Sequence, residues 1–413
     1  MNLRLSGLLI LLTTIGFTQT APRPLTLQEA LSLADQNSPR LRFTSAAMEG
    51  SQAAITTARG RLNPVLTFGS MGYQRTIAPG TVGGLLHGAT FTQPLEMPAL
   101  RRTRIEVAEA GRRSSEIGMA ETRLAIQAAV KHSFYEVLRR RDETELARGT
   151  LQLLEDLQRR IAVQVQVGEA ARLELTRADA EVATARIQMQ SAELRHAGAL
   201  SALYAAVGTP LGNVEPQAAL DPPLVLPPLE TLRHDVLANH PAIALAESEM
   251  RRSEAVLEYE KAQKTPQPSV WADWFHQPDV AQYRFGVTVT LPVRNRREGP
   301  IAEAVAVTHQ TAAVAQQRRL EITADLERAY NLYQVAQQQV TMFEAGTLRG
   351  AEAAVAAAEA AFRFGERGII EVLDAQRVLR ATRLDYLNSQ YDRQLALIDL
   401  EQLRALTLQG GKP

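Results

Sequence analysis

The sequence predicts a mainly α-helical protein with a small β part, in which long helical hairpins carry a few strands. No proline lies between Pro98 and Pro210 or between Pro300 and Pro413, so two long stretches lack the commonest helix breaker. Both stretches are rich in Ala, Leu, Glu, Gln and Arg, which are strong helix formers. Short segments ahead of them alternate apolar and polar residues, and the whole order occurs twice, which indicates an internal duplication.

The composition excludes several classes of protein. The 413 residues carry 45 Lys and Arg against 45 Asp and Glu, whereas a general nucleic-acid binder needs a basic excess to neutralise phosphates. The chain has no cysteine, so disulfides, thiolate nucleophiles, Cys-ligated zinc and Cys-linked lipid anchors are all excluded. No nucleic-acid partner is therefore expected.

The first residues predict a signal peptide over 1–20. Arg4 supplies a positive charge, and Leu5 to Phe17 form an apolar stretch that is short for a membrane span. A buried amphipathic start is the alternative, but the segment lacks separate apolar and polar faces. No later segment offers the roughly 20 apolar residues of a transmembrane helix, so a membrane-spanning part would consist of strands.

Matching motifs place the two repeats at 21–208 and 229–408. Asn37-Ser38-Pro39 corresponds to Asn239-His240-Pro241, and Gly168-Glu169 corresponds to Gly365-Glu366. Between the repeats lies a proline-rich linker, 209–228, expected to run extended on the outside. Residues 409–413 form a tail.

Each repeat is expected to contain a broken helix, a strand hairpin and a long helical hairpin. The broken helices are predicted over 26–61 and 229–264, interrupted before Pro39 and Pro241. The other predicted ranges are strand hairpins at about 64–96 and 268–293, and helices at 99–167, 171–207, 301–364 and 368–407, with hairpin tips near 168 and 365.

The clearest strand is Tyr283 to Leu291, where apolar and polar side chains alternate. One apolar and one polar face over about nine residues is typical of an outer-membrane barrel strand, although a small soluble sheet remains possible. Trp271, Trp274 and Tyr73 are expected at the membrane interfaces. Four strands cannot close a barrel, so strands in lipid imply several copies; three copies would supply twelve strands.

Motifs for catalysis or metal binding are absent. No two of the seven histidines stand four residues apart, no phosphate-binding loop is present, and Gly69-Ser70-Met71-Gly72 lies in a strand rather than at a nucleophile elbow. His234 and His240 are expected on the surface, and Arg139-Arg140-Arg141 on a solvated helix face. We therefore expect no enzyme activity, no cofactor and no metal ligands.

The turns at the two tips carry the most specific pattern. Gly168 and Gly365 follow the last helical residues, as C-terminal caps do. Glu174 and Glu371 stand in the first turn of the next helix, where a carboxylate suits the helix dipole. Capping alone would account for these residues.

With these tips, the sequence resembles the TolC-like outer-membrane efflux channels over essentially the whole mature chain. The opening at Leu25–Leu31, the duplication and the tips carry the resemblance. Phe91–Glu96 with Arg101, Arg102 and Arg104, and Leu291–Arg296, are similar to the heavy-metal cation efflux branch. The pattern departs from that branch at Pro98-Ala99-Leu100, where a glycine-lysine pair is usual.

The resemblance implies a homotrimer in the cell outer membrane, with a twelve-stranded β-barrel in lipid and a trimeric α-helical barrel through the periplasm. It implies two partners, a periplasmic adaptor protein and an inner-membrane pump, expected to be of the RND type. The cargo is expected to be heavy-metal cations, with drugs or other small molecules as the alternative. A periplasmic coiled-coil scaffold without transport would explain the helices but not the amphipathic strands.

By motif position, the resemblance assigns a gate and adaptor-contact tip to Gly365, Arg367, Glu371 and Asp374, with Gly168 and Glu174 on the first tip. Three copies of Asp374 around one axis would form an acidic ring that favours cations. Arg367 is expected to compensate this charge and help hold the closed state.

Overall fold

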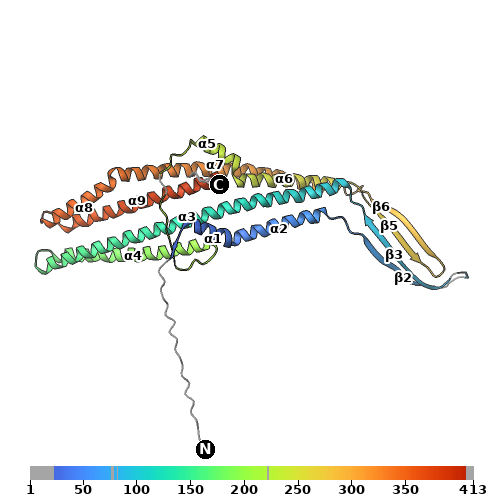
Figure 1. The fold of residues 1–413 in the computed structure, drawn as a ribbon, viewed down its shortest axis with the longest axis horizontal. Coiled ribbons are helices and arrows are strands. Elements are labelled where there is room, and N and C mark those ends of the chain that lie inside the picture. Colours follow the sequence, from blue (N-terminus) through green and yellow to red (C-terminus); the bar gives the residue numbers. More distant parts are fainter. Residues whose placement is uncertain (1–22, 76–78, 81, 221–222, 406–413) are drawn as a thin grey trace, which may run out of the picture.

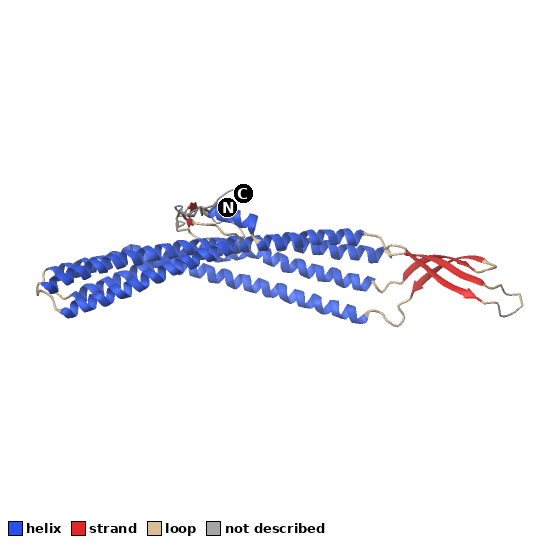
Figure 2. Ribbon diagram, turned by 90° about the horizontal axis from the view of Figure 1, so that it is seen from below, coloured by secondary structure: helices blue, strands red, loops and turns tan. Residues whose placement is uncertain are grey.

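The protein is an elongated rod of helices with a sheet at one end (Figure 1). The computed structural model describes residues 23–75, 79–80, 82–220 and 223–405. The expected signal peptide at 1–20, the tail at 409–413 and the end of the last helix at Thr407 lie outside these residues. Figure 2 shows all the long strands gathered beyond the helix ends, so one end of the rod is β and the other is α.

The main elements of the first half are two short helices, two long strands and two long helices. Their bounds are α1 Leu27–Asn37, α2 Pro39–Arg59, β2 Val65–Gln74, β3 Gly84–Pro94, α3 Pro98–Gln166 and α4 Arg172–Val207. The side chain of Thr26 caps α1, and Pro39 occupies the first position of α2, where its missing N–H costs nothing.

The second half repeats this order. Its elements are α5 Leu229–Asn239, α6 Pro241–Ala262, β5 Gln267–His276, β6 Ala281–Thr290, α7 Glu298–Met342, η1 Phe343–Thr347, α8 Leu348–Arg363 and α9 Ile369–Arg404. The main elements of both halves follow the ranges expected from the sequence. Strand pairing within the sheet runs in the order β2-β3-β5-β6, so β3 and β5 join the two halves.

One expected helix is wrong in detail. The predicted single helix over 301–364 is interrupted by the π-helical segment η1, in which Gly346 has non-helical dihedral angles. The ring of Phe343 within η1 contacts Tyr386 of α9 at a centroid distance of 5.8 Å, which anchors the interruption against the neighbouring helix.

The linker between the halves holds structure that the sequence did not predict. Its segment β4, Val214–Pro216, pairs in parallel with β1, Arg23–Leu25, in a two-stranded sheet. Leu25 is buried and belongs to the main hydrophobic cluster, together with Phe134 and Leu138 of α3. The linker is therefore packed onto the middle of the rod.

The four-stranded sheet has one apolar and one polar face. Cross-strand partners share a face, so the pairs Trp274–Tyr283, Ala272–Phe285 and Val270–Val287 define the apolar one. We call it the outer face; its large, well-exposed side chains are Leu66, Phe68, Tyr73, Leu85, Phe91, Val270, Trp274, Tyr283, Phe285, Val287 and Val289.

Trp271 and Trp274 were both expected at the membrane interfaces, but they lie on opposite faces of the sheet. Trp271 pairs with Gly286, and its indole covers the space that a side chain at Gly286 would need. Beside it, Asp273 accepts hydrogen bonds from Thr90 at 2.8 Å and from Arg284 at 2.9 Å. Because the two tryptophans are three residues apart in a strand, they point to opposite faces, and only Trp274 lies on the outer face.

Candidate functional site

The two hairpin tips have the same backbone design. Gly168 and Gly365 adopt φ angles of 82° and 71°, in the left-handed region that glycine favours. In each turn the following glutamate N–H reaches back to a helical carbonyl, Glu169 to Gln164 at 2.8 Å and Glu366 to Ala361 at 2.9 Å. These bonds satisfy carbonyls that the helix end would leave free, so each glycine closes its hairpin.

The two tips pack against each other through a small apolar cluster. Ile161 of α3, Ala178 of α4, and Ile369 and Val372 of α9 are buried together. Because the cluster draws on both halves of the chain, it sets the tip side chains of one hairpin in a defined position relative to the other.

The predicted tip residues lie around this cluster and face solvent. Gly365, Arg367, Glu371 and Asp374 are exposed, and Glu174 is half-buried. Arg367 lies 3.8 Å from Glu371, whereas Asp374 forms its ion pair with Arg377, one helical turn further along. The arginine expected to compensate Asp374 therefore neighbours Glu371, and Arg377 provides the direct partner of Asp374.

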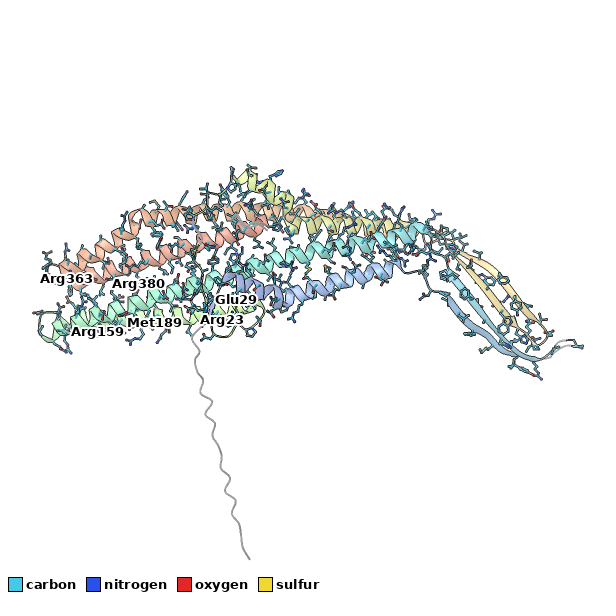
Figure 3. The ribbon with its side chains drawn as sticks, in the orientation of Figure 1. Arg23, Glu29, Arg159, Met189, Arg363 and Arg380 are labelled. Atoms are coloured by element: carbon cyan, nitrogen blue, oxygen red, sulfur yellow. The ribbon has the colours of Figure 1, made fainter. Side chains whose placement is uncertain are left out.

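Further arginines lie on the helices that lead to the tips. Figure 3 shows Arg159, Arg363 and Arg380 on the half of the rod that ends at the tips. Arg363 and Glu359 line a groove of about 560 Å³ between α3 and the α8–α9 pair. Arg377 and Arg380 line a second groove, of about 300 Å³, between α3 and α9. Both grooves between the hairpins are therefore lined by basic and acidic side chains together.

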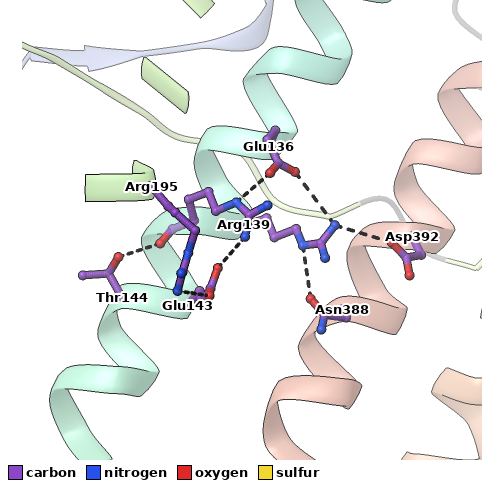
Figure 4. Close-up of polar contacts among 8 residues, drawn as sticks. Glu136, Arg139, Glu143, Thr144, Arg195, Asn388 and Asp392 are labelled. Carbon is purple, nitrogen blue, oxygen red and sulfur yellow. Dashed lines mark hydrogen bonds and ion pairs between the residues drawn. The ribbon is translucent and has the colours of Figure 1, made fainter. Parts of the chain in front are cut away.

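A half-buried polar network lies at the middle of the rod, where the sequence predicts a solvated face. Arg139 donates to Asn388 at 3.1 Å (Figure 4). The neighbouring Arg140 donates to Glu136 and Glu143. The side chains of Arg139 and Arg140 are 22% and 27% exposed. The solvated-face interpretation is wrong for these two half-buried residues: Arg139 bonds Asn388 on α9, which the local sequence does not reveal, whereas Arg140 bonds Glu136 and Glu143 on its own helix.

His240 is a second correction. The expected surface histidine is 6% exposed, and its Nδ1 accepts a hydrogen bond from the Ala242 N–H at 3.1 Å, which caps α6. Burial lowers the pKa of His240, and the nearby Arg318 lowers it further. The side chain is therefore held neutral as a structural cap.

The basic motif after the first strand hairpin holds the junction between sheet and helices. Arg104 pairs with Glu96 at 2.7 Å and donates to the Gly60 carbonyl at 3.0 Å. Arg101 donates to the Arg59 carbonyl at 2.9 Å. In the second half, Arg297 pairs with Glu260 at 2.5 Å. These contacts fix the bend where strands become helices.

The part of the chain that the structure describes contains no group of three or more His, Asp or Glu side chains arranged to hold a metal ion. Separately, no helix in the described part of the chain is both long and apolar enough to cross a membrane.

The sequence matches a known protein family over most of its length. The profile of the family described as outer membrane efflux protein matches residues 30–209 and 232–405, which cover most of the sequence in two segments. The chain belongs to the outer membrane efflux protein family. The two matched segments correspond to the two halves of the fold.

Individual relatives agree with this assignment. The efflux protein is 28% identical over 378 residues to the cobalt-zinc-cadmium resistance protein CzcC of Cupriavidus metallidurans, covering 90% of this chain and 88% of that one. Among solved structures, CusC has a TM-score of 0.78 at 19% identity, covering 92% and 91% of the two chains. The CmeC outer membrane channel of Campylobacter jejuni has a TM-score of 0.79 at 15% identity, covering 92% and 85%.

The solved structures have the same overall fold as this efflux protein. A mainly helical rod with a terminal sheet is the fold that CusC and CmeC share with it. Its family membership makes the chain an outer-membrane efflux protein.

Proposed function

We propose that this efflux protein is the outer-membrane duct of a tripartite system that exports heavy-metal cations. The observation that carries the cargo is the 28% identity to CzcC across 90% of this chain and 88% of that one. A pyoverdine export protein, OpmQ of Pseudomonas aeruginosa, is 25% identical over 286 residues and favours small-molecule export as the second candidate. The longer and closer match makes metal cations the first choice.

The proposed assembly is a homotrimer. In the described sheet, strands β2 and β6 are the edges, and neither has a partner on its outer side. An open edge cannot face lipid because its free N–H and C=O groups would remain unsatisfied. Neighbouring copies can pair β6 of one with β2 of the next, and three copies give a closed barrel of twelve strands. The large apolar side chains of the outer face would then contact lipid.

The proposed duct works passively between two partners. A periplasmic adaptor and an inner-membrane pump of the RND type would supply the cations and the energy, while the rod conducts them outward. Mixed charges along the helices suit a wall with water on both sides, since positive and negative groups are equal in number.

We further propose that the tips form the gate and the adaptor contact. Gly168 and Gly365 set the turns, and Glu174, Arg367, Glu371 and Asp374 offer charged groups at the surface. The Arg367–Glu371 and Arg377–Asp374 pairs would balance the acidic ring when the gate is closed. Cations entering the neck would compete with the arginines for these carboxylates.

Removal of the gene tests the cargo. We expect the deletion strain to accumulate cobalt, zinc or cadmium and to tolerate less of them, and the wild-type gene to restore both properties. Cellular metal content, measured by mass spectrometry, is the readout. Unchanged metal content together with reduced export of a siderophore or drug would replace the proposed cargo with the second candidate.

The closed gate is tested by entry of vancomycin, which the intact outer membrane excludes. Arg367→Ala removes the partner of Glu371, so we expect greater vancomycin sensitivity than in wild type. Arg349→Ala is the matched control, since Arg349 is exposed on the neighbouring α8 and bonds a backbone carbonyl. Equal sensitivity of the Arg367 variant and the control, at equal protein level, would contradict a latch at Arg367.

A further inference from the structure

Two histidines from different halves of the chain meet on the outer face of the sheet. His87 of β3 pairs directly with His276 of β5, and their ring centroids are 4.9 Å apart. His276 is the last residue of β5, before the turn that leads to β6, so the pair lies at the end of the sheet farthest from the helices (Figure 1).

Trp274 packs beside both rings. Its ring centroid lies 5.4 Å from that of His87, in an edge-on arrangement, and 6.4 Å from that of His276. All three side chains share the outer face because His87 and His276 are a cross-strand pair and Trp274 is two residues before His276. The tryptophan limits the rotation of the imidazoles and keeps them together.

Apart from these ring contacts, neither imidazole has a polar partner in the described part of the chain. Within the described residues, no hydrogen bond or ion pair involves the ring nitrogens of His87 or His276, although both side chains are half-buried. Because the two side chains are only half-buried, solvent can reach them, and their ring nitrogens are free to bind an ion.

The spacing fits a shared metal ion. A zinc-type ion lies about 2 Å from a coordinating imidazole nitrogen, so two rings on one ion have centroids about 5 Å apart. Imidazole is a preferred ligand for Zn²⁺, Cu²⁺ and Ni²⁺. From this geometry we infer that His87 and His276 form a binding site for a transition-metal dication at the outer end of the sheet, with water in the remaining coordination positions.

This site differs from the tips in place and in ligand type, and it does not depend on the exported cargo. It also has a structural consequence. The β3–β5 pairing joins the two halves of the chain within the sheet, so a bound ion would link them and stabilise the folded state by mass action.

Tryptophan fluorescence tests the site. The chain has two tryptophans, and Trp271 lies on the opposite face, so Trp271→Phe leaves Trp274 as the single reporter. In purified full-length protein carrying this change, we expect Ni²⁺ to quench the emission saturably and excess Zn²⁺, which does not quench, to reverse the effect. Either His87→Gln or His276→Gln should abolish saturable quenching, whereas exposed His309→Gln should leave it unchanged.

Thermal unfolding gives the second readout. Zn²⁺ should raise the melting temperature of the wild-type protein and of the His309 variant, but not of the His276 variant. Quenching that persists in both the His87 and His276 variants would overturn the site. So would an intact protein whose Trp274 emission responds to vesicles of anionic lipid and not to Ni²⁺, since that would assign the imidazoles to lipid phosphate.

Discussion

The hydroxyl of Tyr391 on α9 donates a 2.7 Å hydrogen bond to Asp142 on α3 and joins the two long helices at the middle of the rod. Asp142 is also paired with Arg141 at 2.8 Å. Burial raises the pKa of the Tyr391 hydroxyl, and the Asp142 carboxylate raises it further, so the group remains a donor. The contact joins residues from opposite halves of the chain, and the Tyr391 ring belongs to the main hydrophobic cluster.

Tyr391→Phe keeps the buried ring and removes this donor. A hydrogen bond to a charged group contributes about 1.5–3 kcal/mol, so we expect a loss of stability in that range. The measurement is chemical denaturation followed by circular dichroism. Tyr386→Phe is the control, because the Tyr386 hydroxyl bonds Glu344 at an exposed position, at 3.1 Å. Equal losses in both variants would contradict a special role for the Asp142 contact.

Gly208 ends α4 where the chain passes the break between α1 and α2. Its φ is +83°, and a Cβ would lie 2.9 Å from Cδ of Pro39 and 3.0 Å from Cα of Ser38. Gly208→Ala should therefore lower the unfolding free energy by more than about 1 kcal/mol. Gly198→Ala, inside α4 with no neighbouring atom within 4 Å, should instead raise it by about 0.5–1 kcal/mol. Thermal unfolding of both variants checks the opposite signs.

His240 makes the stability depend on pH. Its pKa in the folded protein is below the ordinary value of about 6.5, so the unfolded chain binds more protons as the pH falls. The contribution of neutral His240 is complete above about pH 6.5 and is lost progressively as the pH falls below it. Melting temperatures at pH 7.5 and 5.5 should differ more in wild type than in His240→Asn, which keeps a capping acceptor without the charge.

The control for this comparison is His309→Asn, at an exposed position of α7. It should retain the wild-type difference between the two pH values. A His240 variant with the full wild-type pH dependence would show that other groups cause it.

The indole of Trp271 packs directly over Gly286 and leaves no room for a larger residue at that position. Gly286→Ala would overlap Trp271 on the polar face, so less folded protein should reach the outer-membrane fraction. Gly69→Ala, at a position with open space, is the matched control. Adding Trp271→Ala to the Gly286 variant should restore part of the yield, measured by immunoblot after membrane fractionation. No recovery in the double variant would reject the steric explanation.

Local patterns predicted much of the fold. Pro39 and Pro241 placed the helix breaks, Gly168 and Gly365 placed the tips, and the alternation over Tyr283–Leu291 placed one face of the sheet. Each of these signals acts within a few residues. The tip side chains could be located in the same way, but their role stays a prediction.

Contacts between distant residues could not be predicted. Arg139 donates a hydrogen bond to Asn388, which lies 249 positions away in the sequence. The residues next to Arg139 in the sequence gave no sign of this partner, and they predicted a solvent-exposed side chain. Strand β4 forms because Arg23–Leu25 passes beside it, and the π-helical segment is fixed by Phe343 against Tyr386. His87 and His276 likewise come together only because β3 and β5 pair. All of these features depend on contacts between residues that are far apart in the sequence.

The central claim is that this protein forms a cation-conducting duct. The most direct test measures the ionic current through the purified protein in a planar lipid bilayer. Under a salt gradient, we expect stable single-channel currents whose reversal potential shows cation preference. Asp374→Asn should reduce this preference and weaken blockade by multivalent cations, because it removes the negative charge from the tip. Folded protein that carries no current, or an Asp374 variant with unchanged selectivity and blockade, would contradict a duct with an acidic neck.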